Sequence, residues 1–286
     1  MQTGKTIPSI SLCCGDFSAR DTLSSGQCFR WSERDGRMCG TAMGRYVEIA
    51  QKGDIVTIYG ADSGDEALWR RYLDLDRDYA AIRALVVQTE PRLREAAAFA
   101  GGIHILAQEP WEALCSFLIS QNNHIPRIRG IIRRLCVTCG QPAAGWEYAA
   151  GAGAEPTADA MCFPIPEEMA GLTEKDWKAM GCGYRAGYLA ELVRETVAGR
   201  FRVEDLCGVS TNDARRELLK RKGVGPKVAE CVLLYGLGRM ECFPIDVWVG
   251  RGLQGEFAGM EALRRSEYAG VAQQYIFEYM RLRKER

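Results

Sequence analysis

The stretch Leu-Leu-Lys-Arg-Lys-Gly-Val-Gly-Pro-Lys-Val-Ala-Glu-Cys-Val-Leu-Leu-Tyr-Gly-Leu, residues 218–237, decides the fold. Its two opening leucines predict the end of one helix. Pro226 predicts the start of a second helix, because its fixed φ and missing N–H suit a first helical turn. Gly223 and Gly225 between them permit a turn too tight for side chains. Two short helices joined in this way expose backbone N–H groups at a helix N-terminus, which suits a phosphate.

The surroundings of the hairpin support this interpretation. Ser210 and Asp213 predict a capping pair at the start of the first helix. The whole chain has 37 basic and 37 acidic residues and therefore no net charge. A positive local field is nevertheless predicted from the cations around the hairpin, namely Arg215, Arg216, Lys220, Arg221 and Lys222.

Lys227 lies in the first turn of the second predicted helix. A cation is unfavourable there, because the helix dipole places partial positive charge at its N-terminus. This favours the neutral amine, a nucleophile that can form a Schiff base. The alternative, left open by the residues alone, is that Lys227 only contacts a phosphate. Asp246 follows nineteen residues later and is expected to cap a helix. Partly buried beside Pro244 and Trp248, its carboxylate could also stabilise a developing sugar cation.

Composition places the chain among ordinary globular proteins. Of its 286 residues, 47% are apolar and 26% are charged, which suits one large domain or two modest ones and argues against disorder. We expect a soluble, cytoplasmic protein, since no apolar run approaches the roughly 18 residues of a membrane span and no signal peptide is recognised. The twelve cysteines are scattered and predict small buried hydrophobes. Cys136 and Cys139 form one C-x-x-C without a second pair, which is a weak metal signal.

The chain divides into two regions of different periodicity. Segments 28–31, 46–49 and 55–59 predict strands separated by turn residues, whereas helical spacing prevails from about residue 64 onward. We therefore predict an α+β protein, with an N-terminal strand-rich antiparallel sheet domain over residues 1–92 and a larger all-α helical domain over residues 93–286. Residues 140–160 are rich in Ala, Gly and Pro without periodicity and predict a surface insertion.

Residues 223–227, with Asp246 nineteen positions on, resemble the helix-hairpin-helix DNA glycosylase superfamily. A lysine in the hairpin is similar to its bifunctional branch, which combines a glycosylase with an AP lyase. Within the superfamily the resemblance is greatest to the 8-oxoguanine DNA glycosylases. It rests on further segments in the same order, which are similar to that family's glycine loop (25–31), linker (73–76), asparagine-rich turn (120–128), intercalation loop (181–186) and C-terminal pocket helix (270–277).

The resemblance implies a catalytic pair. Lys227 would attack C1′ of the damaged nucleotide, and Asp246 would stabilise the sugar cation and orient the amine. Release of the base leaves a Schiff base, and β-elimination then nicks the strand on the 3′ side.

The resemblance also implies a pocket for the damaged base. Gly26 would offer its backbone carbonyl to the N7–H that 8-oxoguanine has and guanine lacks. Cys231 and Phe277 would sandwich the flipped base, and Gln273 would read its Watson–Crick edge. The residues alone also allow a plain turn at Gly26 and ordinary core roles for Cys231 and Phe277.

A third group of residues is implied to bind DNA around the flipped base. Asn122 would fill the hole in the helix, Tyr184 would wedge the stack, and Arg127 and Arg185 would contact the unpaired cytosine. For the two arginines a solvated face is the alternative. The remaining DNA-binding positions are Asn123, Gly223, Gly225 and Trp248, the last standing where some members carry a histidine.

The implied partner is double-stranded DNA containing oxidised guanine, bound by a monomer away from membranes. No cofactor or metal is required, although backbone carbonyls near Leu219, Arg221 and Val224 are candidates for binding a monovalent cation. Two alternatives remain: an alkyl-base glycosylase of the same fold, and a non-catalytic hairpin protein that binds DNA. Lys227 argues against the first, and its pairing with Asp246 argues against the second.

Overall fold

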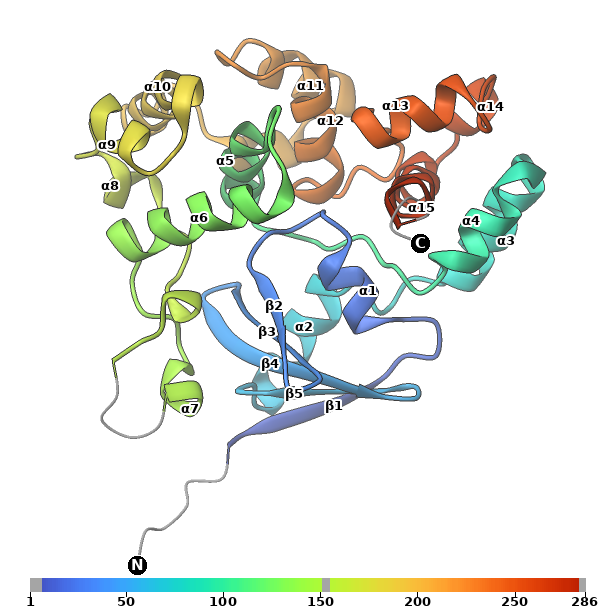
Figure 1. Ribbon diagram of the computed structural model, residues 1–286, viewed down its shortest axis with the longest axis horizontal. Helices are drawn as coiled ribbons and strands as arrows, with labels where there is room; N and C mark the ends of the chain where they lie inside the picture. Colours follow the sequence, from blue (N-terminus) through green and yellow to red (C-terminus); the bar gives the residue numbers. More distant parts are fainter. Residues whose placement is uncertain (1–6, 151–154, 283–286) are drawn as a thin grey trace, which may run out of the picture.

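A computed structural model describes residues 7–150 and 155–282. An antiparallel sheet near the N-terminus is followed by a larger helical part, and Figure 1 shows the helices gathered along one side of the sheet. The predicted α+β class is confirmed. The helix-hairpin-helix lies in the helical part, as α11 (Thr211–Leu219) and α12 (Pro226–Tyr235).

The sheet in the described part of the chain has five strands in the order β1-β5-β4-β3-β2, each antiparallel to its neighbours. Two tight hairpins join β2 to β3 and β3 to β4. Asp35-Gly36 and Met43-Gly44 form these turns with positive φ at both positions, as two-residue hairpins that follow the strand twist require. The strands are β1 (Ser9–Cys13), β2 (Trp31–Arg34), β3 (Arg37–Ala42), β4 (Arg45–Lys52) and β5 (Ile55–Tyr59).

The prediction of a strand over residues 28–31 is largely wrong, because β2 begins only at Trp31. Cys28 and Phe29 are both buried, which is incompatible with the alternating pattern of a strand that has one face in solvent. The Gln108 side chain donates to the carbonyl of Gln27 at 2.6 Å, just before this segment. The segment is thus a fixed connection between α1 and the sheet.

The helices of the described residues build the rest of the molecule. They are α1 (Ala19–Ser24), α2 (Glu66–Tyr72), α3 (Tyr79–Thr89), α4 (Arg94–Phe99), α5 (Pro110–Ser120), α6 (Ile125–Cys139), α7 (Trp146–Ala150), α8 (Pro166–Met169), α9 (Glu174–Ala179), α10 (Ala186–Val197), α11, α12, α13 (Val247–Gln254), α14 (Glu261–Arg264) and α15 (Ala269–Leu282). None of them combines the length and apolar character needed to cross a membrane.

Two large hydrophobic cores correspond to the sheet and to the helices. Val47 and Trp69 lie in the first core, and Leu114 and Tyr275 lie in the second. The chain crosses between them more than once, since Phe29 packs in the helical core and Leu106 packs in the sheet core. The boundary at residue 92 stays a prediction.

Residues 140–160 are not simply a surface loop. Ala143 and Ala160 are fully buried against Cys39 and Tyr46 of the sheet. Backbone bridges pair Ala144 with Arg45 and Pro142 with Met161. The prediction failed because small residues carry little hydrophobic periodicity, although they allow close approach to a sheet. Residues 151–154 lie outside the described part.

Candidate active site

The hairpin forms as the sequence predicts. The Ser210 side chain caps α11 by accepting from the Asp213 N–H. Gly225 is the N-cap of α12. Gly223 has φ +84°, and a Cβ built there would lie 2.3 Å from the Tyr188 ring. Glycine is therefore required at 223 both by the backbone conformation and by the packing of α10 against the turn.

The predicted positive field around the hairpin needs correction. Each of the five cations is paired with a carboxylate, so their charges are largely neutralised locally. Two of the partners, Glu191 and Glu195, come from α10, which packs beside the hairpin but is distant in sequence. The pairs are Arg215–Glu230, Arg216–Asp213, Lys220–Glu217, Arg221–Glu195 and Lys222–Glu191.

The side chain of Lys227 reaches from the first turn of α12 towards α5. Its Nζ donates a hydrogen bond to Ser120 Oγ at 3.2 Å and lies 4.9 Å from the centroid of the Phe117 ring. Cys231, one helical turn later, is buried. Burial raises the pKa of the Cys231 thiol to about 11, although the nearby charge of Lys227 acts in the opposite direction. At neutral pH this thiol therefore presents an uncharged, polarizable surface beside the amine.

Asp246 caps α13, as predicted. Its Oδ1 accepts from the Val249 N–H at 2.8 Å. Burial raises the pKa of this carboxyl, whereas the N–H of Val249 and the charge of Lys227 lower it. The carboxylate is held by the start of the helix and faces the same cavity as Lys227, so it can act on a positive charge that develops between them.

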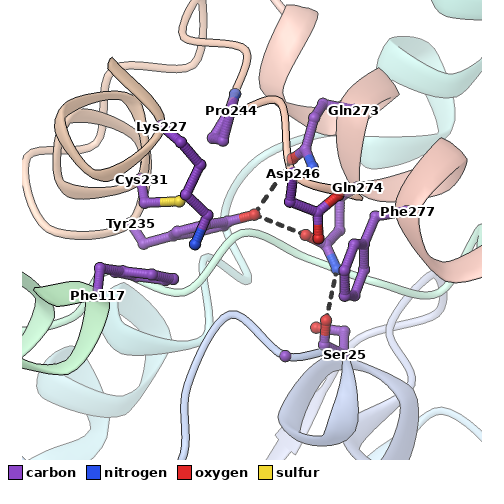
Figure 2. A pocket seen from close by; sticks show the side chains of 11 residues that line it. Ser25, Phe117, Lys227, Cys231, Tyr235, Pro244, Asp246, Gln273, Gln274 and Phe277 are labelled. Atoms are coloured by element: carbon purple, nitrogen blue, oxygen red, sulfur yellow. Dashed lines mark hydrogen bonds between the residues drawn. The ribbon is translucent and has the colours of Figure 1, made fainter. Parts of the chain in front are cut away.

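The catalytic and base-binding residues named from the sequence meet at one cavity. Gly26, Lys227, Cys231, Asp246, Gln273 and Phe277 all line it. Figure 2 shows the five side chains of this set, from α12, the start of α13 and α15, converging above the loop at Ser25. Gly26 has φ +77°, and a Cβ placed there would lie 3.2 Å from Cζ of Phe277. The cavity measures about 30 Å³, which accommodates water but not a purine.

Several residues that complete the cavity are not predicted from the sequence. Phe117 and Tyr235 form part of its wall and stack with their ring centroids 5.4 Å apart. Gln274 donates to the backbone carbonyl of Ser25 at 2.9 Å. A signal for Gln274 was present, because two consecutive glutamines in an otherwise apolar stretch require buried hydrogen-bond partners.

The asparagine-rich turn lies between α5 and α6. Asn122 is exposed and adopts φ +45°, while the Asn123 side chain donates to the carbonyl of Ile119 at 3.3 Å. The solvated-face alternative is wrong for Arg185, which is only 4% exposed. Its guanidinium donates to the carbonyls of Gln121 and Asn122. Arg185 thus stabilises the turn from the protein interior, and its contact with DNA stays a prediction.

The other expected DNA-binding side chains lie at the surface of the described part. Arg127 is exposed and donates to the Gly181 carbonyl at 3.4 Å. This bond joins the asparagine turn to the loop that carries Tyr184, whose side chain is 55% exposed. Trp248 is half-buried in α13, with the Arg251 guanidinium 5.2 Å from its ring centroid. The roles of these residues towards DNA stay predictions.

The described residues contain no cluster of three or more His, Cys, Asp or Glu side chains that could hold a metal ion. Cys136, one half of the C-x-x-C pair, is buried in α6, and burial raises the pKa of its thiol to about 12. A neutral thiol is a poor metal ligand, since metals bind the thiolate.

An antiparallel sheet, a helical part and a glycine hairpin that carries a lysine into a cavity together form the fold of the helix-hairpin-helix DNA glycosylases. Comparison with known proteins narrows the class. A family model described as the N-terminal domain of 8-oxoguanine DNA glycosylase matches residues 9–114. The chain is similar to Clostridium acetobutylicum 8-oxoguanine glycosylase/lyase, which was crystallised in complex with double-stranded DNA, and the two sequences are 30% identical. Its TM-score is 0.85, with 96% of this chain and 98% of that chain covered. The chain belongs to the 8-oxoguanine DNA glycosylase family.

Curated relatives carry matching names. The N-glycosylase/DNA lyase of Saccharomyces cerevisiae is 37% identical over 164 residues, and the probable N-glycosylase/DNA lyase of Methanothermobacter thermautotrophicus is 32% identical over 208 residues. These alignments cover 52% and 62% of this chain. They span only 40% and 62% of the two relatives, less than two thirds of either.

Proposed function

We propose that this protein is a base-excision-repair enzyme that removes 8-oxoguanine from double-stranded DNA, preferably opposite cytosine, and then nicks the strand as an AP lyase. The observation that carries the proposal is the shared cavity of Lys227, Asp246 and Gly26 at the hairpin. The activities named for its relatives support the same reaction.

In the first step, the Nζ of Lys227 forms a bond to C1′ of the damaged nucleotide as the C1′–N9 bond breaks. The departing purine takes the electron pair and gains a proton. Positive charge develops on the deoxyribose, and the carboxylate of Asp246 stabilises it. Opening of the sugar ring gives a Schiff base, loss of a C2′ proton then breaks the C3′–O bond, and hydrolysis releases the enzyme.

Recognition of the oxidised base depends on the loop at Gly26. Its carbonyl accepts from the N7–H of 8-oxoguanine, whereas guanine would leave this acceptor facing a lone pair. Such a mismatch costs on the order of 1–3 kcal/mol, so earlier inspection steps supply part of the discrimination. Cys231 and Phe277 hold the two faces of the base, and Gln273 contacts its Watson–Crick edge.

Around the extruded base, Asn122 occupies the gap in the duplex and the exposed Tyr184 wedges the stack. Arg127 contacts the unpaired cytosine directly. The buried Arg185 supports the carbonyl side of the same turn and contributes to this contact from behind. Asn123 and Trp248 complete the surface that faces the DNA backbone.

The hairpin itself binds a DNA phosphate through the backbone at Gly223 and Gly225. Carbonyls near Leu219, Arg221 and Val224 would hold a monovalent cation, which would supply positive charge beside the phosphate. Because the neighbouring basic side chains are paired with carboxylates, such a cation would supply charge that the hairpin otherwise lacks. The protein acts as a monomer.

The decisive test is borohydride trapping on a duplex that contains a single 8-oxoguanine opposite cytosine. The wild-type protein should form a covalent adduct that is absent in Lys227→Gln. Lys222→Gln is the matched control, because Lys222 lies in the same hairpin but is paired with Glu191 outside the cavity. The control should still give the adduct, and both variants should still bind the duplex.

Other outcomes overturn the proposal. If folded wild-type protein binds DNA but gives neither excision nor an adduct, the chain is a non-catalytic hairpin protein. If it releases methylated purines without trapping, it is an alkyl-base glycosylase of the same fold.

A further inference from the structure

A hydrogen-bonded chain of three buried side chains forms one wall of the base pocket. The Tyr235 hydroxyl is 2.7 Å from Oε1 of Gln274 and 3.2 Å from Oε1 of Gln273. Nε2 of Gln274 donates to the backbone carbonyl of Ser25 at 2.9 Å. Figure 2 shows the chain running from Gln273 through Tyr235 and Gln274 to Ser25. All four residues are less than 5% exposed.

The donor and the acceptor of each hydrogen bond in this chain can be assigned by starting from the Ser25 carbonyl. The carbonyl of Ser25 can only accept, so the amide nitrogen of Gln274 must face it and its oxygen must face Tyr235. That oxygen takes the single hydrogen of the Tyr235 hydroxyl. The hydroxyl oxygen then has only lone pairs to offer to Gln273.

If the amide oxygen of Gln273 faced the Tyr235 hydroxyl, lone pairs would meet lone pairs with no hydrogen between them. Such a contact is costly in a buried site. Turning the Gln273 amide end for end removes the conflict, because an N–H of Gln273 then donates to Tyr235. Oxygen and nitrogen of an amide are distinguished only by such bonding requirements. In this orientation Gln273 presents its carbonyl oxygen, rather than its N–H groups, to the pocket that it lines.

We propose that Tyr235 and Gln274 are positioning residues that fix the amide orientation of Gln273, and thereby select bases whose Watson–Crick edge donates hydrogen bonds. This inference rests on the proposed function of the pocket. It adds two residues of the cavity wall, one from α12 and one from α15, that act on the base through Gln273, and it explains why two consecutive glutamines are buried.

The class of base that is selected follows from the donors and acceptors of its Watson–Crick edge. In 8-oxoguanine, N1–H and the 2-amino group are adjacent donors that match a free amide oxygen. In 8-oxoadenine, N1 is an acceptor and the 2-amino group is absent, although N7–H and the C8 oxygen are the same. The two lesions therefore make the same contact with Gly26 and differ along the Watson–Crick edge that Gln273 contacts, where 8-oxoadenine also has a 6-amino group in place of the C6 oxygen.

The test compares single-turnover excision of 8-oxoguanine and 8-oxoadenine, each placed opposite cytosine in the same duplex sequence. The ratio of the two rates measures edge selection and is unaffected by a loss of folded protein. In Tyr235→Phe both glutamines lose the shared hydroxyl, and the Gln273 amide becomes free to turn. The preference for 8-oxoguanine should fall about tenfold, the cost of one mismatched buried hydrogen bond.

Gln274→Met gives a second, directional result. Without the oxygen of Gln274, the hydrogen of the Tyr235 hydroxyl is available to the oxygen of Gln273, so the amide should present its N–H groups to the pocket. The preference for 8-oxoguanine should then fall below that of Tyr235→Phe. The matched control is Tyr275→Phe, which removes a fully buried hydroxyl that has no hydrogen-bond partner among the described residues. It should leave the ratio unchanged.

The outcomes separate this inference from the proposed function. If wild-type protein excises neither lesion, the proposed function fails. If wild-type protein excises 8-oxoguanine and both variants keep its preference, the function stands and the positioning role of Tyr235 and Gln274 is refuted. A Tyr275→Phe variant that changes the ratio as much as Tyr235→Phe would refute it as well, because any lost hydroxyl would then have the same effect.

Discussion

Replacement of Gly223 by alanine tests the claim that backbone conformation and packing together require glycine in the hairpin. At φ +84° a side chain is strained whatever space surrounds it. The added Cβ would also lie 2.3 Å from Cδ2, 2.6 Å from Cγ and 3.0 Å from Cβ of Tyr188. These atoms lie near the base of the tyrosine side chain, so a small rotation cannot move them away.

The two costs can be estimated separately. A left-handed conformation costs an ordinary residue about 1–2 kcal/mol, and inserting a carbon into a packed contact costs about 1–3 kcal/mol. Reduced freedom of the unfolded chain returns about 0.4–1 kcal/mol to any Gly→Ala change. We therefore expect Gly223→Ala to lower the free energy of unfolding by roughly 1–4.5 kcal/mol.

Two glycines of the same chain serve as controls. Gly36 has φ +75° with nothing within 4 Å of its added Cβ, so Gly36→Ala measures the backbone cost alone. Gly225 in the same hairpin has φ −89° and equally open space. Gly225→Ala should therefore change stability by less than about 1 kcal/mol, the typical cost of alanine at an N-cap.

Urea unfolding followed by tryptophan fluorescence measures all three variants, provided that the slope of free energy against urea stays constant. Combining Gly223→Ala with Tyr188→Ala should recover the packing cost and leave the backbone cost. The reasoning is refuted if Gly223→Ala is no more destabilising than Gly36→Ala, because the ring contact would then cost nothing.

Three further changes test the site and its support. Asp246→Asn keeps a good helix cap, so the free energy of unfolding should change by less than about 0.5 kcal/mol. The rate of 8-oxoguanine excision should nevertheless fall at least about 100-fold. A loss of excision explained entirely by a loss of folded protein would contradict the electrostatic role. Burial raises the pKa of Asp246, so its carboxylate gains a proton at a higher pH than an exposed aspartate does. Wild-type excision should therefore decline at that higher pH on acidification. The decline should be absent from the pH profile of Asp246→Asn. Burial raises the pKa of Glu112 to about 7, so its charge is fully present only above that pH. At pH 8.5, Glu112→Gln leaves the buried guanidinium of Arg30, now 3.4 Å from Glu112, without its counter-charge and should cost about 3–5 kcal/mol in urea unfolding. A cost below that of an exposed pair would show that Arg30 is solvated. Gly26→Ala and Gly36→Ala share the same backbone strain, but only the first brings a Cβ within 3.2 Å of the Phe277 ring. Only Gly26→Ala should therefore reduce the ratio of 8-oxoguanine to guanine excision.

Features that depend on neighbouring residues could be predicted from the sequence. The end of α11, the start of α12, the cap at Ser210 and the cap at Asp246 all follow from side chains within a few positions of the helix terminus. The turn residues expected between the strands likewise include Asp35-Gly36, where the structure has a hairpin. In each case the interacting groups are close in the chain, so their chemistry can be read without knowledge of the tertiary structure.

Features that depend on contacts between distant segments could not be predicted in this way. The carboxylates that neutralise Arg221 and Lys222 lie on α10, nearly thirty residues earlier. Burial of Arg185 required knowing that the asparagine turn packs directly over it. Tyr235 could be assigned to an inward-facing helix stripe, but not to a hydrogen-bonded chain with α15. Charge and polarity patterns specify what a residue requires, and only the fold specifies which partner meets that requirement.

The geometry of the cavity indicates which part must move when a base enters. The loop around Gly26 is held on both sides, by Gln274 on the Ser25 carbonyl and by Gln108 on the Gln27 carbonyl. The ring of Phe277, in contrast, touches the loop without a hydrogen bond and is only half-buried. A rotation of Phe277 breaks dispersion contacts and a long contact with the Arg281 guanidinium, 6.0 Å from the ring centroid, whereas a shift of the loop would leave two buried donors unpaired. Under the proposed function, the acceptor that recognises the oxidised base is therefore fixed in advance, and the Phe277 ring is the part that moves to admit the base.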